Sequence, residues 1–382
     1  GVSTLHLFLW NIPVDLSNQS KWFLMVFYVL AIKTFLTIYT TPYTALAAEI
    51  SEDYTERTRI QAVKTVFFIL GIFMAATFGM AFFFRSTELY PMGQLNPQGY
   101  QNISIFGSAF MMLSMSLAYL GTSNLIRSLN ERILSNKSPS FKQFLHEMKT
   151  ALLNKNLRSV VLGYLFANIS SALLSTLALH VYTFTFQIGT SDIAMIVGFQ
   201  LIMSILCQPF WIRFSDRFEK KGAVQAGIIL AMIASLYFVL CVIFRTIVQG
   251  TVWWFLPFSL LAGFGTGGLF TLPQAMVADA VDANALVEGK RQEGVFYGIL
   301  TLGYKLSQSI ALVLMGFALD LLGFNPELHI QENATLTGLG LVMSLGSLFS
   351  FGLAYLSYSP YSLTKRRMEE IHSAIHYLFD DS

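Results

Sequence analysis

Nine long apolar segments, separated by short polar stretches, run along the chain after an apolar start. They lie near residues 22–48, 63–84, 103–126, 159–186, 192–212, 223–245, 252–280, 294–321 and 336–360. As a helix, each segment is long enough to cross roughly 30 Å of hydrocarbon. Residues 1–13 are also apolar and resemble the tail of a truncated span. The pattern predicts an all-α, polytopic membrane protein with nine full spans and one partial span.

The composition agrees with a membrane protein and argues against other classes. Hydrophobic residues make up 54% of the chain and charged residues 12%, and the mean hydropathy is +0.57, values that soluble domains do not combine. The net charge is only +2, and no basic cluster is interleaved with aromatic residues, so we expect no nucleic-acid partner. Cys207 and Cys241 lie inside apolar runs, as small core residues do.

No nucleotide-binding loop, zinc-ligand spacing or nucleophile motif occurs in the sequence. We therefore expect no organic cofactor, no metal site and no enzymatic activity.

Basic residues are distributed unevenly between the two ends of the predicted spans. Of the 24 Lys and Arg residues, 18 fall in segments that alternate to one side, namely 49–62, 127–158, 213–222, 281–293 and the tail after 360. The opposite side has three, all at the ends of apolar segments. Basic loops stay in the cytoplasm. The charges therefore predict a multi-pass protein of the cell membrane, plasma or inner, with a cytoplasmic C-terminus.

The longest polar connection divides the chain into two parts. We predict an N-terminal half at residues 1–126 that lacks about two and a half helices, a cytoplasmic connection at 127–158, a six-helix C-terminal half at 159–360 and a cytoplasmic tail at 361–382. Part of the connection is expected to be helical. The tail has the spacing of an amphipathic surface helix, either solvated or bound to the membrane.

Lys305 is the charged residue that carries most information, because it lies deep inside an apolar segment. About ten residues, or roughly 15 Å at helical rise, separate it from either end, which is too far for its ammonium group to reach the headgroups. A lysine at such depth normally faces a partner or a watery cavity. Lys33 lies similarly deep, and the spans carry no carboxylate there. The two lysines predict acidic partners elsewhere or a cavity that receives an anion.

Charged residues at the predicted cytoplasmic ends of the spans are candidate gating residues. One group consists of Asp279, Asp282, Arg291 and Glu293. The two aspartates share a helix face, as acid–base catalysis would require. Their basic neighbours favour the ionised form, however, so we interpret the group as a gate or a network that orders the loop.

A second charged run, RFSDRFEKK at residues 213–221, lies at another cytoplasmic end. Asp216 and Arg217 within it are expected either to latch one conformation or to be solvated. Lys64, inside the second apolar segment, joins the gating and structural set. Glycines at 263, 265, 267 and 268 favour either bending or static close packing of helices.

Two stretches resemble a known family. Residues 273–321 carry the aspartates, the KRQEG turn at 290–294, Tyr297, Lys305 and Asp320, and residues 40–57 carry Pro42-Tyr43, Ala45-Leu46, Glu49, Asp53 and Arg57. Both are similar to the glycoside–pentoside–hexuronide:cation symporters, the melibiose-permease branch of the major facilitator superfamily. The stretch from Gln208-Pro209 through residues 213–221 resembles the superfamily's loop motif between helices 8 and 9. The resemblance implies a two-half helical bundle.

The resemblance also implies a site, with departures. Lys305 and Thr301 match a lysine and a threonine of the family site. Thr40, however, stands where melibiose-type members carry an aspartate, and Phe270 stands where they carry a sugar-stacking tryptophan. The cation-site aspartates of the family lie on helix 2, one of the helices that the N-terminal half is expected to lack. The expected substrate and cation site comprises Lys305, Thr40, Tyr43, Thr301, Phe270 and Lys33.

The implied function is secondary active transport of a small solute, sugar or glycoside-like, by alternating access in a monomer. Na⁺ or H⁺ would be the coupling ion, and the solute and the lipid bilayer would be the only partners. Two alternatives stay open at this point: a lysophospholipid-type carrier on the same scaffold, and a membrane receptor or scaffold that transports nothing.

Overall fold

The computed structural model describes residues 1–13, 15–49, 67–133, 141–289, 292–325, 328 and 331–379. Within these ranges every regular element is a helix, which confirms the predicted all-α class. The chain divides into two compact units, Gly1–Ser138 and Pro139–Ser382. The division falls inside the connection predicted at residues 127–158. Residues 127–133 end a helix of the first unit, and the helix Phe141–Leu153 belongs to the second.

The first unit contains α1 (Val2–Trp10), α2 (Asn18–Glu49), the helical stretch 67–83 with η1 (Met74–Phe78) and α4 (Gly79–Phe83), η2 (Gly93–Leu95) and α5 (Pro97–Ile133). The short α1 packs against α2 and α5. Its polar side chains fix it there: His6 Nδ1 lies 3.1 Å from the hydroxyl of Ser108 on α5, and Asn11 Nδ2 donates to Ser104 Oγ at 3.3 Å. The N-terminal apolar stretch is thus a packed helix.

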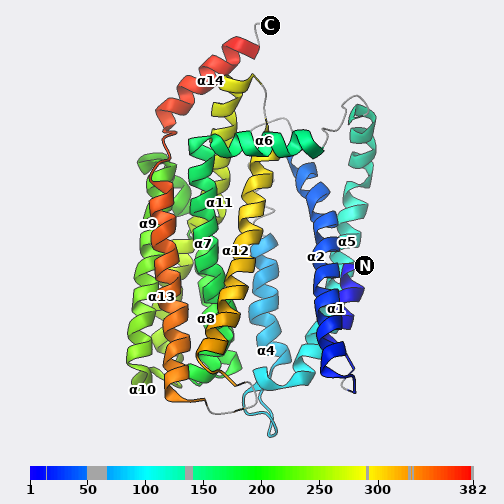
Figure 1. Ribbon diagram of the computed structural model, residues 1–382, viewed down its shortest axis with the longest axis vertical. Coiled ribbons are helices and arrows are strands. Elements are labelled where there is room, and N and C mark those ends of the chain that lie inside the picture. Colours follow the sequence, from blue (N-terminus) through cyan, green and yellow to red (C-terminus); the bar gives the residue numbers. More distant parts are fainter. Residues whose placement is uncertain are drawn as a thin grey trace. The chain divides into compact units, whose positions relative to one another are not determined.

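The second unit contains most of the helices (Figure 1). They are α6 (Phe141–Leu153), α7 (Lys155–His180), η3 (Val181–Thr185), α8 (Thr190–Leu206), α9 (Gln208–Ile243), α10 (Arg245–Val248), η4 (Val252–Phe255), α11 (Leu256–Glu288), α12 (Glu293–Leu321), α13 (Asn333–Tyr358) and α14 (Lys365–Phe379). The main packing partners are α9 with α11, and α13 with α7 and α9. Two further helices, α12 and α8, pack on α7 and α11 respectively.

Within the described residues, seven helices are long and apolar enough to cross a membrane, and 67–83 and Thr190–Leu206 are shorter apolar helices. The predicted spans at 192–212 and 223–245 do not coincide with α8 and α9. The first span breaks at Cys207, where Pro209 cannot donate a backbone hydrogen bond, and then continues into the start of α9. The second span is the remainder of α9, after non-helical backbone at Phe218 and Glu219.

Hydroxyl groups join α7 to α13 along their length. Ser159 Oγ donates to the carbonyl of Ser357 at 2.6 Å, Ser350 Oγ donates to the carbonyl of Phe166 at 2.7 Å, and the Ser170 hydroxyl donates to the Ser347 carbonyl. Small hydroxyl side chains let membrane helices approach closely and satisfy polar groups across the contact. These bonds therefore fix the register of α13 on α7.

The glycines of α11 mark a close approach to α8 and α9. A Cβ on Gly263 would lie 2.3 Å from the carbonyl oxygen of Gln200, and one on Gly265 would lie 2.8 Å from that of Gly227. Real Cβ atoms do not come so near to backbone oxygen, so glycine is required at both positions. Of the two readings of this glycine run, the geometry supports close packing, while bending stays a prediction.

Candidate functional site

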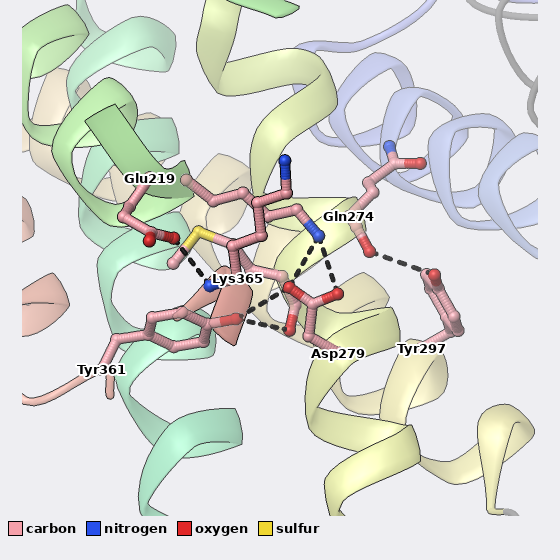
Figure 2. Close-up of polar contacts among 8 residues, drawn as sticks. Glu219, Gln274, Asp279, Tyr297, Tyr361 and Lys365 are labelled. Atoms are coloured by element: carbon pink, nitrogen blue, oxygen red, sulfur yellow. Dashed lines mark hydrogen bonds and ion pairs between the residues drawn. The ribbon is translucent and has the colours of Figure 1, made fainter. Parts of the chain in front are cut away.

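A charged polar group in the second unit centres on Asp279 of α11. Lys220 Nζ, from α9, lies 2.7 Å from both carboxylate oxygens of Asp279. The Tyr361 hydroxyl, from the segment between α13 and α14, donates to Asp279 Oδ2 at 3.2 Å. Figure 2 shows the phenol directed at the carboxylate. One carboxylate therefore joins three separate parts of the chain.

The turn before Lys220 places this lysine and its neighbour. Glu219 has φ 67°, a left-handed conformation that is uncommon for a residue other than glycine, and it ends the first part of α9. The Glu219 side chain also contacts the start of α14: its Oε2 accepts a hydrogen bond from the backbone N–H of Lys365 at 2.8 Å. A strained backbone is retained where the surroundings hold it, and here the first turn of α14 does so.

We call residues 359–364 the C-terminal strap. It is fastened at further points besides Tyr361: Lys221 Nζ donates to the Ser359 carbonyl, and Asn156 Oδ1, on α7, accepts from Ser362 N at 2.9 Å and from Ser362 Oγ at 3.1 Å. The strap is thus tied to α7, α9 and α11. Beyond it, α14 packs against α11, and its side chains Met368 and Ile371 are buried.

Burial sets the electrostatics of this group. Tyr361 is 3% exposed, whereas the side chains of Asp279 and Lys220 are 12% and 34% exposed. Burial first, and then the negative charge of Asp279, raise the pKa of Tyr361 far above its ordinary value. The phenol therefore stays a hydrogen-bond donor to the carboxylate under physiological conditions.

A second set of hydrogen bonds joins α7, α11 and α12 at the same end. The Tyr297 hydroxyl donates to the carbonyl of Gln274 at 3.0 Å (Figure 2). Asn284 accepts from Asn154 Nδ2 at 3.4 Å and donates to Gln292 Oε1 at 3.5 Å. The ends of these three helices are therefore linked by neutral hydrogen bonds, beside the charged group.

Lys305 lies on α12 and its side chain is exposed. It stands 12 residues after Glu293 and 16 before Leu321, or roughly 18 and 24 Å at helical rise. One turn away on either side, Thr301 and Ser309 are also exposed, as is the neighbouring Leu302. This face of α12 therefore presents one cation and two hydroxyl groups among apolar side chains. Phe270, on α11, is half-buried.

The remaining predicted site residues are placed as follows. Lys33 is exposed on α2, and Asp216 and Arg217 are exposed before the turn in α9, where the Arg217 guanidinium lies 5.5 Å from the centre of the Phe218 ring. Asp282, on α11, is half-buried.

For the others, the backbones of Thr40, Tyr43 and Glu293 are helical, but their side chains lie outside the described set. Lys64 and Arg291 lie outside the described residues altogether. The structure thus joins Asp279 to Lys220 and Tyr361, two residues that the sequence interpretation did not select. A signal for Lys220 was available, because the basic pair at 220–221 falls on the same predicted side as Asp279.

Gln208, at the break between α8 and α9, is a third polar residue, and the sequence interpretation placed it in the loop motif without giving it a role of its own. Its Nε2 donates to the carbonyls of Ser204 and Gly267 at 3.0 and 2.7 Å, and its Oε1 accepts from Thr271 Oγ1 at 3.0 Å. It satisfies carbonyl groups where Pro209 interrupts the helix. The signal was an amide directly before a proline inside an apolar run.

The described residues contain no group of three or more His, Cys, Asp and Glu side chains that could hold a metal ion. An ionic pair and a buried phenol hold helices together at this site, and Lys305 adds an exposed cation on α12.

Comparison with known proteins finds relatives that match over most of this chain, among them the following three. The chain is 25% identical over 390 residues to the sodium-dependent lysophosphatidylcholine symporter 1-A of Danio rerio, covering 95% of this chain and 70% of that protein. It is 24% identical over 343 residues to an uncharacterized symporter of Bacillus subtilis, covering 88% and 68%. It is 25% identical over 401 residues to a sphingosine-1-phosphate transporter of Xenopus tropicalis, covering 96% and 73%.

The names of these relatives describe two symporters and a transporter, in keeping with the apolar helices described above. Residues 2–365 match the protein family described as MFS/sugar transport protein. Because the match extends over nearly the whole chain, this protein belongs to that family of multi-pass membrane transporters.

Proposed function

We propose that this protein is a sodium-coupled symporter of a single-chain amphipathic lipid whose headgroup carries a phosphate, and that it works by alternating access. The observation that carries the proposal is Lys305, an exposed cation about halfway along an apolar helix with leucines beside it. A cation at that depth is stable where it meets an anion or water. The phosphate would meet Lys305, and the acyl chain would lie along the exposed Leu302 and Leu306.

The polar side chains of the second unit favour a lipid over a sugar. A sugar is normally bound by several free donors and acceptors together with a stacking aromatic ring. Here the amide of Asn168 donates to the carbonyl of Tyr164, and Gln208 is engaged at the break between α8 and α9. The buried Trp211 donates its indole N–H to the carbonyl of Phe264 at 2.7 Å. These groups serve the packing of the helices.

Two of the three relatives support the same class of solute, since their names specify lysophosphatidylcholine and sphingosine-1-phosphate. The name of the Danio rerio symporter also supports sodium as the coupling ion. Sugar or glycoside transport is the second candidate. It is favoured by the family description and by the likeness of Lys305 and Thr301 to the melibiose-type site.

Uptake by the purified protein in liposomes tests the proposal. We expect saturable uptake of a fluorescent lysophosphatidylcholine that is driven by an inward Na⁺ gradient and lost when K⁺ replaces Na⁺. Empty liposomes measure spontaneous insertion of the lipid. Counterflow of melibiose or another glycoside without lysolipid uptake would favour the second candidate. A proton gradient that replaces the Na⁺ gradient without loss would contradict sodium coupling, and failure of all solutes would favour a receptor or scaffold.

A further inference from the structure

The corner between α6 and α7 carries a patch of basic residues. Its binding partner is not among the groups described above. Only Asn154 separates α6 from α7, and α6 lies crosswise over the ends of α7 and α12 (Figure 1). We call Lys149, Leu152, Leu153, Lys155 and Arg158 the corner patch. All five side chains are exposed, with Leu153 at 71% and Leu152 at 39%.

The corner is held in one geometry by Asn154. Its Oδ1 accepts hydrogen bonds from the backbone N–H groups of Asn156 and Leu157, at 3.0 and 3.1 Å, and so caps the start of α7. Its Nδ2 donates to Asn284 on α11. At helical rise, the backbone of every corner-patch residue lies within about 8 Å of the corner. The three cations are therefore gathered at one place.

The charge of the corner patch is uncompensated within the described residues. None of Lys149, Lys155 and Arg158 forms an ion pair or side-chain hydrogen bond there, and no acidic residue occurs between Glu147 and Asp192. The cations of α14 differ, because Arg366 and Arg367 pair with Glu370. An unpaired cationic group of this kind is complementary to anions.

The position of the corner patch selects the kind of anion. It lies where α7, a helix able to cross a membrane, begins, and α6 lies across the helix ends. Exposed leucines beside basic residues are typical of segments that rest in the headgroup layer, with the apolar side chains inserted below it. We infer that the corner patch binds anionic phospholipid headgroups of the surrounding bilayer and fixes the α6–α7 corner at the membrane surface.

Lipid titration of the purified full-length protein, followed by native mass spectrometry, tests this inference. Phosphatidylglycerol and phosphatidylcholine would be compared at equal concentration. We expect Lys149→Gln/Lys155→Gln/Arg158→Gln to lower the retention of phosphatidylglycerol about tenfold, because each cation contributes to attraction by an anionic surface, and to leave phosphatidylcholine unchanged. The matched control is Lys365→Gln/Arg366→Gln/Arg367→Gln, which removes three exposed charges from α14 and should retain phosphatidylglycerol.

An equal loss in both triple variants would show a general effect of net charge and overturn the inference, as would no loss in either. A second measurement checks the membrane location. Leu153→Cys, labelled with a fluorophore in vesicles, should be quenched by lipids spin-labelled at the headgroup. Cys207 and Cys241 are buried and give little background labelling. Quenching by aqueous acrylamide alone, or protection from both quenchers, would mean that water or protein covers the corner patch instead.

Discussion

Lys220 of α9 and Asp279 of α11 form an ion pair in which the lysine nitrogen lies 2.7 Å from both oxygens of the carboxylate. The two residues are 59 positions apart in the chain. Because Asp279 also accepts from Tyr361, this pair connects the turn in α9 to the C-terminal strap.

The first prediction is that Lys220→Gln and Asp279→Asn are energetically coupled. Because Asp279 is largely buried, each single change should lower the free energy of unfolding, and a double-mutant cycle should give a coupling of about 1–2 kcal/mol. Chemical unfolding in mixed micelles measures it. The exposed pair Arg367–Glu370 is the control, with an expected coupling below about 0.5 kcal/mol. Equal couplings for the two pairs would mean that burial of Asp279 adds nothing.

The second prediction concerns Tyr361→Phe and pH. The folded protein raises the pKa of this phenol above its ordinary value of 10.0, so the proton is held more tightly in the folded state. The contribution to stability is therefore fully present below pH 10 and is lost as the pH rises through the folded-state pKa. The stability advantage of the wild type over Tyr361→Phe should be constant from pH 6 to pH 9 and should shrink above pH 10. Unfolding measured across this range checks it, and an advantage that grows above pH 10 would contradict it.

The third prediction concerns Lys305. Lys305→Ala should leave folded protein in the membrane but abolish coupled uptake, because the cation that meets the solute or balances the site is gone. Lys305→Arg should restore uptake only in part, since a planar guanidinium differs in shape from an ammonium group. Leu314→Ala, nine residues along α12 and therefore on the opposite side of the helix, is the control and should transport normally. Wild-type uptake with unchanged ion dependence in Lys305→Ala would mean that the lysine is merely tolerated.

The fourth prediction separates packing glycines from permissive ones. Gly263→Ala places a methyl group against the Gln200 carbonyl and should cost about 1–3 kcal/mol of stability, through overpacking. Gly316→Ala, on α12, meets nothing within 4 Å and should be neutral or stabilising by up to about 1 kcal/mol. Thermal unfolding of the two variants in the same detergent compares them. Similar behaviour would contradict the close approach of α8 to α11.

The fifth prediction tests the orientation inferred from basic residues. Lys142→Cys, on α6, should resist a membrane-impermeant thiol reagent applied to intact cells and should label after permeabilisation. Leu89→Cys is the opposite control, since Leu89 is 82% exposed and lies on the predicted outer side. Efficient labelling of Lys142→Cys from outside would reverse the topology.

Hydrophobic patterning predicted the helices well, because a membrane requires a long apolar run for each crossing. The glycine run of α11 left bending and close packing as alternatives, and the structure supports close packing. The break at Cys207 and the left-handed Glu219 were not foreseen, since the first depends on a single proline and the second occurs at a residue type that seldom adopts that conformation.

The charged group was only half predictable. Asp279 was conspicuous because acids are rare beside apolar helices, but nothing in local spacing points from Asp279 to Tyr361, which lies 82 positions away. Such a contact depends on how α11 and α13 each pack against α7 and α9. The periodicity of a single segment does not predict that arrangement. Other members of the predicted site, Thr40 and Tyr43 among them, have side chains outside the described set, so their roles stay predictions.

The C-terminal strap changes what shortening or fusing this protein would mean in practice. A protein cut after Tyr358 would lose bonds from α7, α9 and α11 together, and would leave Asp279 and Lys220 without the phenol that covers them. The residues after the last long apolar helix therefore hold the ends of three helices together. A purification tag attached beyond residue 379 would leave the contacts of the C-terminal strap intact, whereas one inserted between Ser359 and Thr364 would break them.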